Sequence, residues 1–315
     1  MNTVGLPSTV IIGGANLDVT GSCENRVIPG DSNPGTIRTS AGGVGRNIAE
    51  NLARLNFRCT MLTALGDDVG KELIIRSCKD TGIDISHVMV EPQLATGSYI
   101  AINNQLGALL AAVSDMEIIH AISPDWLEQK HDIILSHDQI LIEANLDEAS
   151  LQWIAANRQD KPLLVDAVSA TKAVKLKSIL SEIELLKVNR DEAAAILGQQ
   201  AKDDILAQML FEEKGVKNVL LSQGPQGAML YTQNGLVRKS AIKGINASDT
   251  GAGDALFAGY VAARHLLNTE AEQLEFAIAC ATFTLSSLLS VNPLLSVNEI
   301  HKQYLNHLSR GAWRT

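Results

Sequence analysis

The most chemically suggestive stretch of the 315-residue chain is a short run of small residues that leads into a helical pattern. The run is Asp249-Thr250-Gly251-Ala252-Gly253-Asp254, and the helical pattern covers Gly253–Leu267. Small residues before a helix leave several backbone N–H groups unpaired at its positive end, which is a natural site for an anion. Asp254 falls in the first turn, where its carboxylate either stabilises the helix or acts as a general base facing the anion.

A second polar cluster follows the first apolar run. That run leads into Gly14-Ala15-Asn16-Leu17-Asp18, and Ala41-Gly42-Gly43-Val44-Gly45-Arg46-Asn47 later opens a helical pattern that extends to Leu55. The glycines permit close approach of the backbone to a ligand, and Asn16, Asp18 and Asn47 supply donors and acceptors suited to vicinal hydroxyls. The alternative is a glycine-rich turn capped by an asparagine. A dinucleotide fingerprint is not matched, because Ile48 stands where the third glycine is needed.

Two further motifs follow predicted strands. In the run Lys187–Glu192, Asn189 either caps the next helix together with Glu192, or the pair lies near a hydrated magnesium ion. These two interpretations are compatible. The run Ser222-Gln223-Gly224-Pro225-Gln226-Gly227 is either a plain turn or a place where the backbone passes close to a nucleotide. Each motif is weak by itself.

The elements that must position these motifs alternate along the chain. Buried strands alternating with amphipathic helices are typical of a mainly parallel sheet covered on both faces. The predicted strands are Thr9–Gly13, Cys59–Ala64, Gln139–Glu143, Leu163–Asp166, Leu185–Val188 and Asn218–Ser222. The predicted helices are Val44–Leu55, Gly70–Lys79, Glu148–Ala156, Asp191–Leu197, Asp203–Glu213, Gly253–Leu267, Ala271–Leu289 and Val297–Leu308.

Two segments do not fit this alternation. Asp18–Ser40 is rich in Gly, Pro, Asn and Thr, and Thr96–Val113 alternates like an exposed β-ribbon. Both could form a small sheet that projects from the main body. The alternative is a pair of long surface loops.

Composition narrows the classes of function. The net charge of −9 argues against nucleic acid as a partner, although backbone N–H groups and magnesium can still bind a polyphosphate locally. The four cysteines are scattered, which indicates reduced thiols in a cytoplasmic protein rather than disulfides or a zinc site. The start of the chain predicts a strand rather than a signal peptide, and no stretch approaches the length of a membrane span.

Taken in order, the motifs resemble the ribokinase-like (PfkB) family of carbohydrate and nucleoside kinases, over essentially the whole chain. That family has an N-x-D strand end, a GG-x-x-x-N helix start, an N-x-x-E element, a [ST]-x-G-x-x-G turn and a GAGD helix. The resemblance implies a Rossmann-like three-layer α/β/α fold. Residues 1–315 would form a single kinase domain, with a β-sheet lid from about residues 18–40 and 96–113.

The resemblance also implies roles for single residues. Asp254 would be the base that takes the proton of an acceptor hydroxyl, and the backbone of Gly251, Ala252 and Gly253 would form the anion hole. Magnesium would be ordered through water by Asn189 and Glu192. The acceptor, a small sugar or nucleoside, would be bound by Asn16, Asp18, Asn33, Gly42, Gly43, Asn47, Ser98 and Asp254. ATP would be bound by Asn189, Ser222, Gly224, Gly227, Gly251 and Gly253.

The lid is the more discriminating part of the acceptor site. Polar groups among Asp31, Ser32, Asn33 and Ser98 are expected to read the base of a nucleoside acceptor. Unpaired strands at the edges of a lid favour a homodimer formed through it.

Some alternatives stay open on the sequence. Relatives often bind a monovalent cation such as potassium near the GAGD motif, but Ser248 stands where many of them have Asp, with Asp249 one place later. The acceptor could be ribose, adenosine, another nucleoside, fructose or a phosphosugar. A phosphosugar is less favoured, because Arg26 and Arg38 are the only basic residues between Asp18 and Ser40. A silent sugar- or nucleotide-binding module is a further alternative, whereas a Rossmann oxidoreductase fails on the missing fingerprint.

Overall fold

The main sheet of the protein is mostly parallel. We describe a computed structural model, in which residues 5–244 and 250–304 are described. Within those residues the main sheet has eight strands in the order β14-β13-β12-β11-β10-β9-β1-β4. Only β13 and β14 run antiparallel to their neighbours. The strands are β1 (Thr9–Ile12), β4 (Cys59–Leu62), β9 (Gln139–Glu143), β10 (Leu163–Asp166), β11 (Leu185–Asn189), β12 (Val219–Ser222), β13 (Ala228–Thr232) and β14 (Gly235–Lys239).

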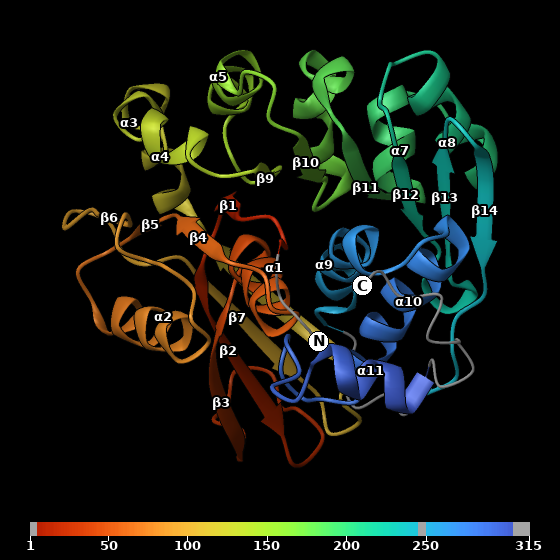
Figure 1. Cartoon of the computed structure of the whole chain (residues 1–315). Coiled ribbons are helices and arrows are strands. Elements are labelled where there is room, and N and C mark those ends of the chain that lie inside the picture. The colour runs from red at the N-terminus through yellow and green to blue at the C-terminus, as the bar shows by residue number, and fades with distance from the viewer. Residues whose placement is uncertain (1–4, 245–249, 305–315) are drawn as a thin grey trace.

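Helices cover both faces of this sheet, because its strands are apolar on both sides. Ile11 packs into one core, while its neighbours Val10 and Ile12 pack into the other. The first core is closed by α1 (Val44–Arg54), α2 (Val69–Asp80), α9 (Ala252–Leu266), α10 (Glu270–Leu285) and α11 (Val297–Tyr304). The second is closed by α3 (Pro124–Gln129), α4 (His131–Leu135), α5 (Glu148–Asn157), α6 (Ala170–Ala173), α7 (Arg190–Leu197) and α8 (Asp203–Glu212). Figure 1 shows the resulting three layers.

The two segments that break the alternation form a second sheet, which we call the lid. Its strands lie in the order β3-β2-β7-β8, and β2 pairs in parallel with β7. They are β2 (Asn16–Cys23), β3 (Gly35–Gly42), β7 (Ser98–Asn103) and β8 (Leu109–Asp115). The lid extends below the main sheet in Figure 1. The alternative of two surface loops is therefore wrong.

A small parallel pair, β5 (Ala64–Leu65) and β6 (Met89–Val90), lies beside the main sheet.

The predicted strands and helices are all present, with differences at their ends. The predicted helix Ala271–Leu289 ends at Leu285, because the hydroxyl of Ser286 donates to the carbonyl of Phe283 and competes with the helical bonds. The predicted helix Val297–Leu308 is present as far as Tyr304, and its remaining residues lie outside the described part of the chain.

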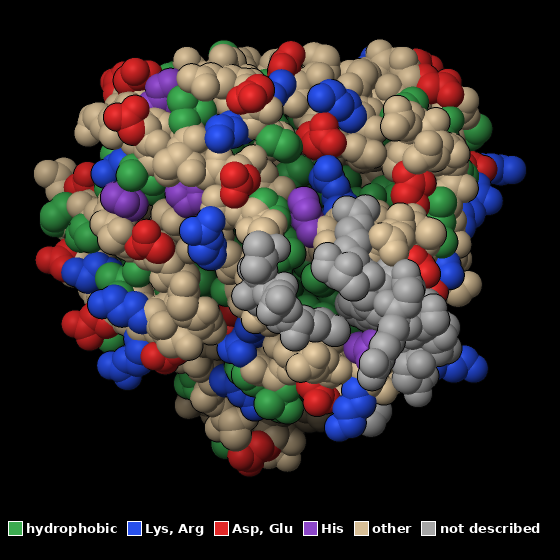
Figure 2. Space-filling view, in the orientation of Figure 1, with side chains coloured by type: hydrophobic (Ala, Val, Ile, Leu, Met, Phe, Trp, Pro, Cys, Tyr) green, Lys and Arg blue, Asp and Glu red, His purple; other side chains and the backbone are tan. Residues whose placement is uncertain are grey.

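The surface carries mixed charge. On the face seen in Figure 2, acidic and basic side chains are intermixed rather than gathered by sign. Among the helices of residues 5–244 and 250–304, none combines the length and the apolar character that crossing a membrane requires.

Helices α9 and α10 pack unusually closely, and a glycine makes this possible. A Cβ atom at Gly259 would lie 2.9 Å from Cβ of Cys280 and 3.0 Å from Cα of Ala277. Since α9 begins at the predicted anion hole, this contact fixes the element that carries Asp254.

We expect Gly259→Val to lower the free energy of unfolding by about 2–3 kcal/mol, because the added side chain overpacks this contact. Urea unfolding would measure the change. Ala271→Val, in the first turn of α10 where the residue is only partly buried, is the matched control and should change stability by less than about 1 kcal/mol. Equal effects of the two variants would contradict the packing argument.

Candidate active site

The predicted site residues gather at the carboxyl ends of the parallel strands. Strands β1, β9, β10, β11 and β12 all point the same way and end at one edge of the sheet. The helices α1 and α9 begin at that edge. In open α/β sheets ligands bind there, outside the ends of the strands.

The proposed base lies at the start of α9 and contacts α1. The side-chain amide of Asn47 donates to Oδ2 of Asp254 at 2.8 Å, which joins two residues that are 207 positions apart. Gly251 caps the helix with φ 79°, and a Cβ atom there would lie 1.8 Å from the carbonyl oxygen of Ser290. Only glycine fits this left-handed, crowded position, so the helix can begin here with its N–H groups open.

A buried ammonium group lies beside the predicted anion hole. Lys187 is 7% exposed, and a Cβ atom at Gly253 would lie 3.2 Å from its Nζ. Nζ is 3.1 Å from a carboxylate oxygen of Asp166. Burial lowers the pKa of Lys187, but the charges of Asp166, Glu192 and Asp254 more than reverse this, so the group stays protonated. A transferring phosphoryl group would therefore meet both open N–H groups and a positive charge.

The surroundings of Asp254 suit a general base at neutral pH. Burial and then the negative charge of Asp166 raise the pKa of Asp254 to about 7, against the opposing effects of Asn47 and Lys187. Glu143 adds a further negative charge. A base is most effective when its pKa lies near the working pH.

The predicted acceptor residues lie together at the base of the lid. Nδ2 of Asn16 donates to Oδ1 of Asp18 at 2.6 Å. A Cβ atom at Gly42 would fall 2.1 Å from Oδ2 of Asp18, and one at Gly43 would fall 2.6 Å from the carbonyl oxygen of Gly14. These two glycines allow β3 and the start of α1 to approach the end of β1. Burial raises the pKa of Asp18, while the bond from Asn16 opposes the shift.

A fully buried carboxylate, that of Glu143, supports this side of the site. It ends β9 and accepts hydrogen bonds from the backbone N–H groups of Gly14 at 2.7 Å and Asn145 at 2.6 Å. Burial raises the pKa of Glu143, and these two bonds oppose the shift. The carboxylate thereby holds Gly14, which lies just before Asn16 and Asp18 of β2, against the end of the neighbouring strand.

Asn189 and Glu192 form a complete capping box at the start of α7. The Asn189 side chain accepts from the Glu192 N–H at 2.9 Å, and the Glu192 carboxylate accepts from the Asn189 N–H at 2.8 Å. No cluster of three or more metal-ligating side chains is present among the described residues. A magnesium ion that keeps its water and is held mainly by phosphate oxygens needs few protein ligands. The role of Asn189 and Glu192 in ordering such an ion through water stays a prediction.

The predicted nucleotide turn lies one strand further along. Ser222 pairs with Asn189 across β12 and β11, so the two motifs are adjacent. Gly224 and Gly227 both have positive φ, and a Cβ atom at Gly227 would lie 2.1 Å from the carbonyl oxygen of Lys239. Gly227 thus lets the turn pass close to the backbone at the end of β14. Its role in binding ATP stays a prediction.

The predicted lid residues are in different situations. Ser98 starts β7 next to Leu17 of β2, near the acceptor residues. Asn33 lies in the turn between β2 and β3, where its amide bonds the backbone of Ile28 and Asp31. The Asn33 side chain thus has a structural use, and its predicted contact with an acceptor stays a prediction. Ser248 and Asp249, on which the question of a monovalent cation depends, lie outside the described residues.

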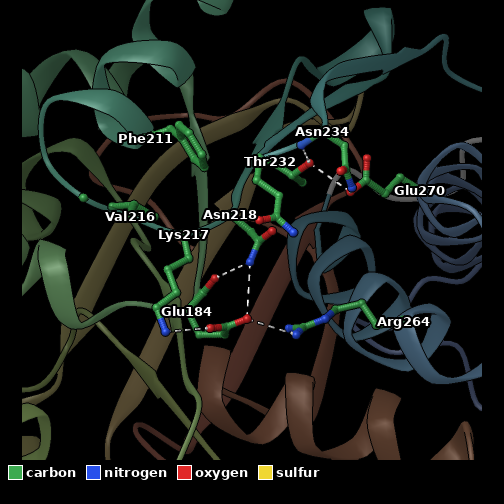
Figure 3. Close-up of a pocket in the computed structure, with 11 residues that line it drawn as sticks. Glu184, Phe211, Val216, Lys217, Asn218, Thr232, Asn234, Arg264 and Glu270 are labelled. Atoms are coloured by element: carbon green, nitrogen blue, oxygen red, sulfur yellow. Dashed lines mark hydrogen bonds and ion pairs between the residues drawn. The ribbon is translucent and has the colours of Figure 1, made fainter.

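A separate cavity of about 440 Å³ lies at the opposite end of the sheet. Figure 3 shows Glu184 there between Lys217 and Arg264, with Asn218 beside it. Arg264 is ten residues after Asp254 in α9, hence about 15 Å away along the helix. The paired charges tie the end of α9 to the sheet, and the cavity is distinct from the site at the carboxyl edge.

Four charged residues of the site were not selected from the sequence. Glu143 and Asp166 are the last residues of two predicted strands, and Lys187 interrupts a third buried strand. Arg46 belongs to the glycine-rich motif, where it contacts Asn47. A charged residue that ends or interrupts a fully apolar strand is the signal that could have found the first three.

Comparisons with known structures agree with this fold. A carbohydrate kinase from Agrobacterium tumefaciens superposes with a TM-score of 0.84 at 30% identity, over 96% of this chain and 97% of that chain. A ribokinase from Arabidopsis thaliana in complex with ribose and ATP shares the fold, with a TM-score of 0.83 at 22% identity over 97% and 100%. The predicted ribokinase-like fold is thereby confirmed.

Sequence comparison gives the family. Pseudouridine kinase of Escherichia coli strain K12 is 35% identical to this chain, over 92% of the chain and 94% of that protein. The family model for pfkB family carbohydrate kinases matches residues 7–296. The chain therefore belongs to the pfkB family of carbohydrate kinases and is a phosphotransferase that acts on a sugar or nucleoside.

Proposed function

We propose that the protein transfers the γ-phosphoryl group of ATP to the 5′-hydroxyl of pseudouridine, giving pseudouridine 5′-phosphate and ADP. The observation that carries the kinase chemistry is the contact of Asp254, at the open start of α9, with Asn47 of the acceptor side. The 35% identity with the E. coli enzyme over nearly the whole chain supports pseudouridine as the acceptor.

We expect an in-line transfer, as is general for phosphoryl transfer. Asp254 accepts the proton of the 5′-hydroxyl as that oxygen forms its bond to the γ-phosphorus, and the bond from the γ-phosphorus to the bridging oxygen of ADP breaks. The N–H groups at Gly251–Gly253 and the ammonium of Lys187 stabilise the transferring group. Magnesium held through water by Asn189 and Glu192 would neutralise charge on the phosphates.

The lid favours an acceptor without charge, because it offers few basic side chains to bind a phosphate. Arg26 and Arg38 are the only basic residues between Asp18 and Ser40, and both are exposed. Asn16, Asp18 and Asn47 at its base offer the carboxylate and amide groups that suit the hydroxyls of a ribose ring. Another nucleoside, ribose or fructose would use the same base and anion hole, and is the alternative acceptor.

An acceptor panel tests the proposal. We expect kcat/KM, measured by release of ADP from magnesium-ATP, to be highest for pseudouridine among pseudouridine, uridine, cytidine, adenosine, inosine, ribose and fructose. A site built to pair a polar ring atom discriminates by about 10⁴-fold against an analogue that lacks it. Stronger activity on another acceptor would keep the kinase class and discard pseudouridine.

Asp254→Asn is the control for the chemistry. Because it removes the base, it should lower kcat by about 10²–10⁴-fold with little change in ATP binding. Wild-type turnover in this variant would contradict the assignment of the base. No turnover of any acceptor by the wild type would favour a silent binding module.

The lid should supply the selectivity for the nucleobase of the acceptor. Ser98 keeps hydrogen-bonding capacity, since its hydroxyl donates only to the carbonyl of Thr96. We expect Ser98→Ala to lower the ratio of kcat/KM for pseudouridine to that for uridine by about tenfold, and Asp31→Ala and Ser32→Ala to act in the same direction. Asn33→Ala should lower the ratio too, but it also loosens the turn. Thr36→Ala, at an exposed lid position, is the control, and an unchanged ratio in all four variants would refute this role.

We also propose a homodimer formed through the lid. Residues paired across strands share a face, so Ile37, Val19, Ile100, Ile102 and Val113 lie on one side of the lid. Ile37 is 78% exposed and Val113 is 66% exposed. A continuous apolar face of this kind, on a sheet with open edges at β3 and β8, is self-complementary to a second copy.

We expect the wild type to be a dimer at micromolar concentration and the double variant Ile100→Asp/Val113→Asp to be a monomer, because two carboxylates would be buried unpaired in the interface. Analytical ultracentrifugation would measure this. Leu294→Asp, at a residue that is 71% exposed outside the lid, should leave the dimer intact. A monomeric wild type, or a dimeric lid variant, would refute the proposal.

A further inference from the structure

The partner of Asp254 is itself held by a buried arginine. Arg46, next to Asn47 in α1, is 2% exposed. Its guanidinium donates to the carbonyl of Gly42 at 3.1 Å and to the hydroxyl of Ser77 at 3.1 Å. It also donates to the Glu50 carboxylate and to Oδ1 of Asn47. The arginine thus joins the end of β3, α1 and α2 at the side of the active site.

The chemistry of the two groups fixes which way the Asn47 amide points. A guanidinium carries only donors, so the amide oxygen must face Arg46. The amide nitrogen then faces the other way, where it lies 2.8 Å from Oδ2 of Asp254. If the amide turned over, its oxygen would face the carboxylate, which would lose a hydrogen bond and gain a repulsive contact.

We propose that Arg46 is a positioning residue for phosphoryl transfer, which orients the Asn47 amide so that it donates to the Asp254 carboxylate. This inference rests on the proposed function, because it takes Asp254 as the base. Arg46 acts on the base only through Asn47, and through that contact it favours the ionised carboxylate that can accept a proton.

The other groups that face Asp254 make its hydrogen bond from Asn47 important. Burial and the negative charges of Asp166 on β10 and Glu143 on β9 raise the pKa of Asp254. The hydrogen bond from Asn47 and the positive charge of Lys187 on β11 lower it. Lys187 is held in place by Asp166, whereas the Asn47 amide depends on Arg46 for its orientation. Loss of Arg46 should therefore raise the pKa of the base.

The surroundings of Arg46 provide a matched control and a means of rescue. Arg54 lies two turns along α1 and pairs with the same Glu50 at 2.7 Å, but its other hydrogen bond goes to the carbonyl of Pro293 rather than to Asn47. Arg46, Glu50 and Arg54 line a cavity of about 400 Å³ between α1, α2 and the segment 289–293. A guanidinium ion from solution can reach the space that Arg46 would vacate.

The test is the pH profile of kcat/KM for pseudouridine. In Arg46→Ala the loss relative to wild type should be about tenfold larger at pH ~6 than at pH ~9, because a pKa raised by about one unit keeps the base protonated at low pH. Arg46→Lys keeps a charge beside Glu50, but it lacks the planar fork whose two terminal nitrogens reach Glu50 and Asn47 separately, so it should show the same trend. Arg54→Ala should lower kcat/KM by the same factor at every pH.

Chemical rescue gives a second readout. Guanidinium chloride at about 20 mM, too dilute to denature most proteins, should restore part of the low-pH activity of Arg46→Ala, and sodium chloride at the same ionic strength should not. A loss that is equal at all pH values in both Arg46 variants, with no rescue, would overturn the positioning role.

The two proposals fail in different ways. Wild-type turnover in Asp254→Asn would show that Asp254 is not the base, and it would overturn this inference as well. An inactive Asp254→Asn, together with Arg46 variants that follow the wild-type pH profile, would overturn only the role of Arg46 and leave the proposed function standing.

Discussion

The ammonium group of Lys187 lies buried among carboxylates, 3.1 Å from Asp166 and close enough to Glu192 and Asp254 for their charges to act on it. Isolated carboxylates at these depths would take up protons rather than stay charged. The positive charge of Lys187 opposes this effect of burial on the pKa of Glu192 and Asp254, and it also attracts the phosphates of a nucleotide. The capping box of α7, the start of α9 and the end of β10 all converge on this charge, so the arrangement of the site depends on it.

The second constraint on the site is the close approach of the backbone segments that form it. The segments around the site can approach one another because glycines take the places where side chains would collide. Gly251 lies against Ser290, Gly42 against Asp18 and Gly43 against the end of β1. A fourth glycine, Gly259, allows the close packing of α9 on α10, which fixes the helix that carries the proposed base.

The sequence predicts the elements of this fold well, because apolar strands and amphipathic helices leave clear periodicity. The motifs at Asn189 and Ser222 end parallel strands, and they therefore meet at one edge of the sheet. The sequence does not reveal Glu143 and Asp166 as neighbours of Asp254, because strand order and register are set by tertiary packing. The bond from Asn47 to Asp254 spans 207 residues and leaves no local pattern. Asn33 shows a second limit, since the sequence does not reveal that its polar side chain closes a turn.

The lid is continuous with the residues at its base. Strand β2 runs from Asn16 to Cys23, and β3 returns from Gly35 to Gly42, where Gly43 joins it directly to α1 and Asn47. Asn16 and Asp18 belong to β2 itself, so a tilt of the lid would move both, whereas Asn47 in the buried helix α1 would stay against Asp254. Opening of the lid would then separate the acceptor residues of β2 from the proposed base. The acceptor hydroxyl would meet Asp254 only under a closed lid, which would protect ATP from transfer to water.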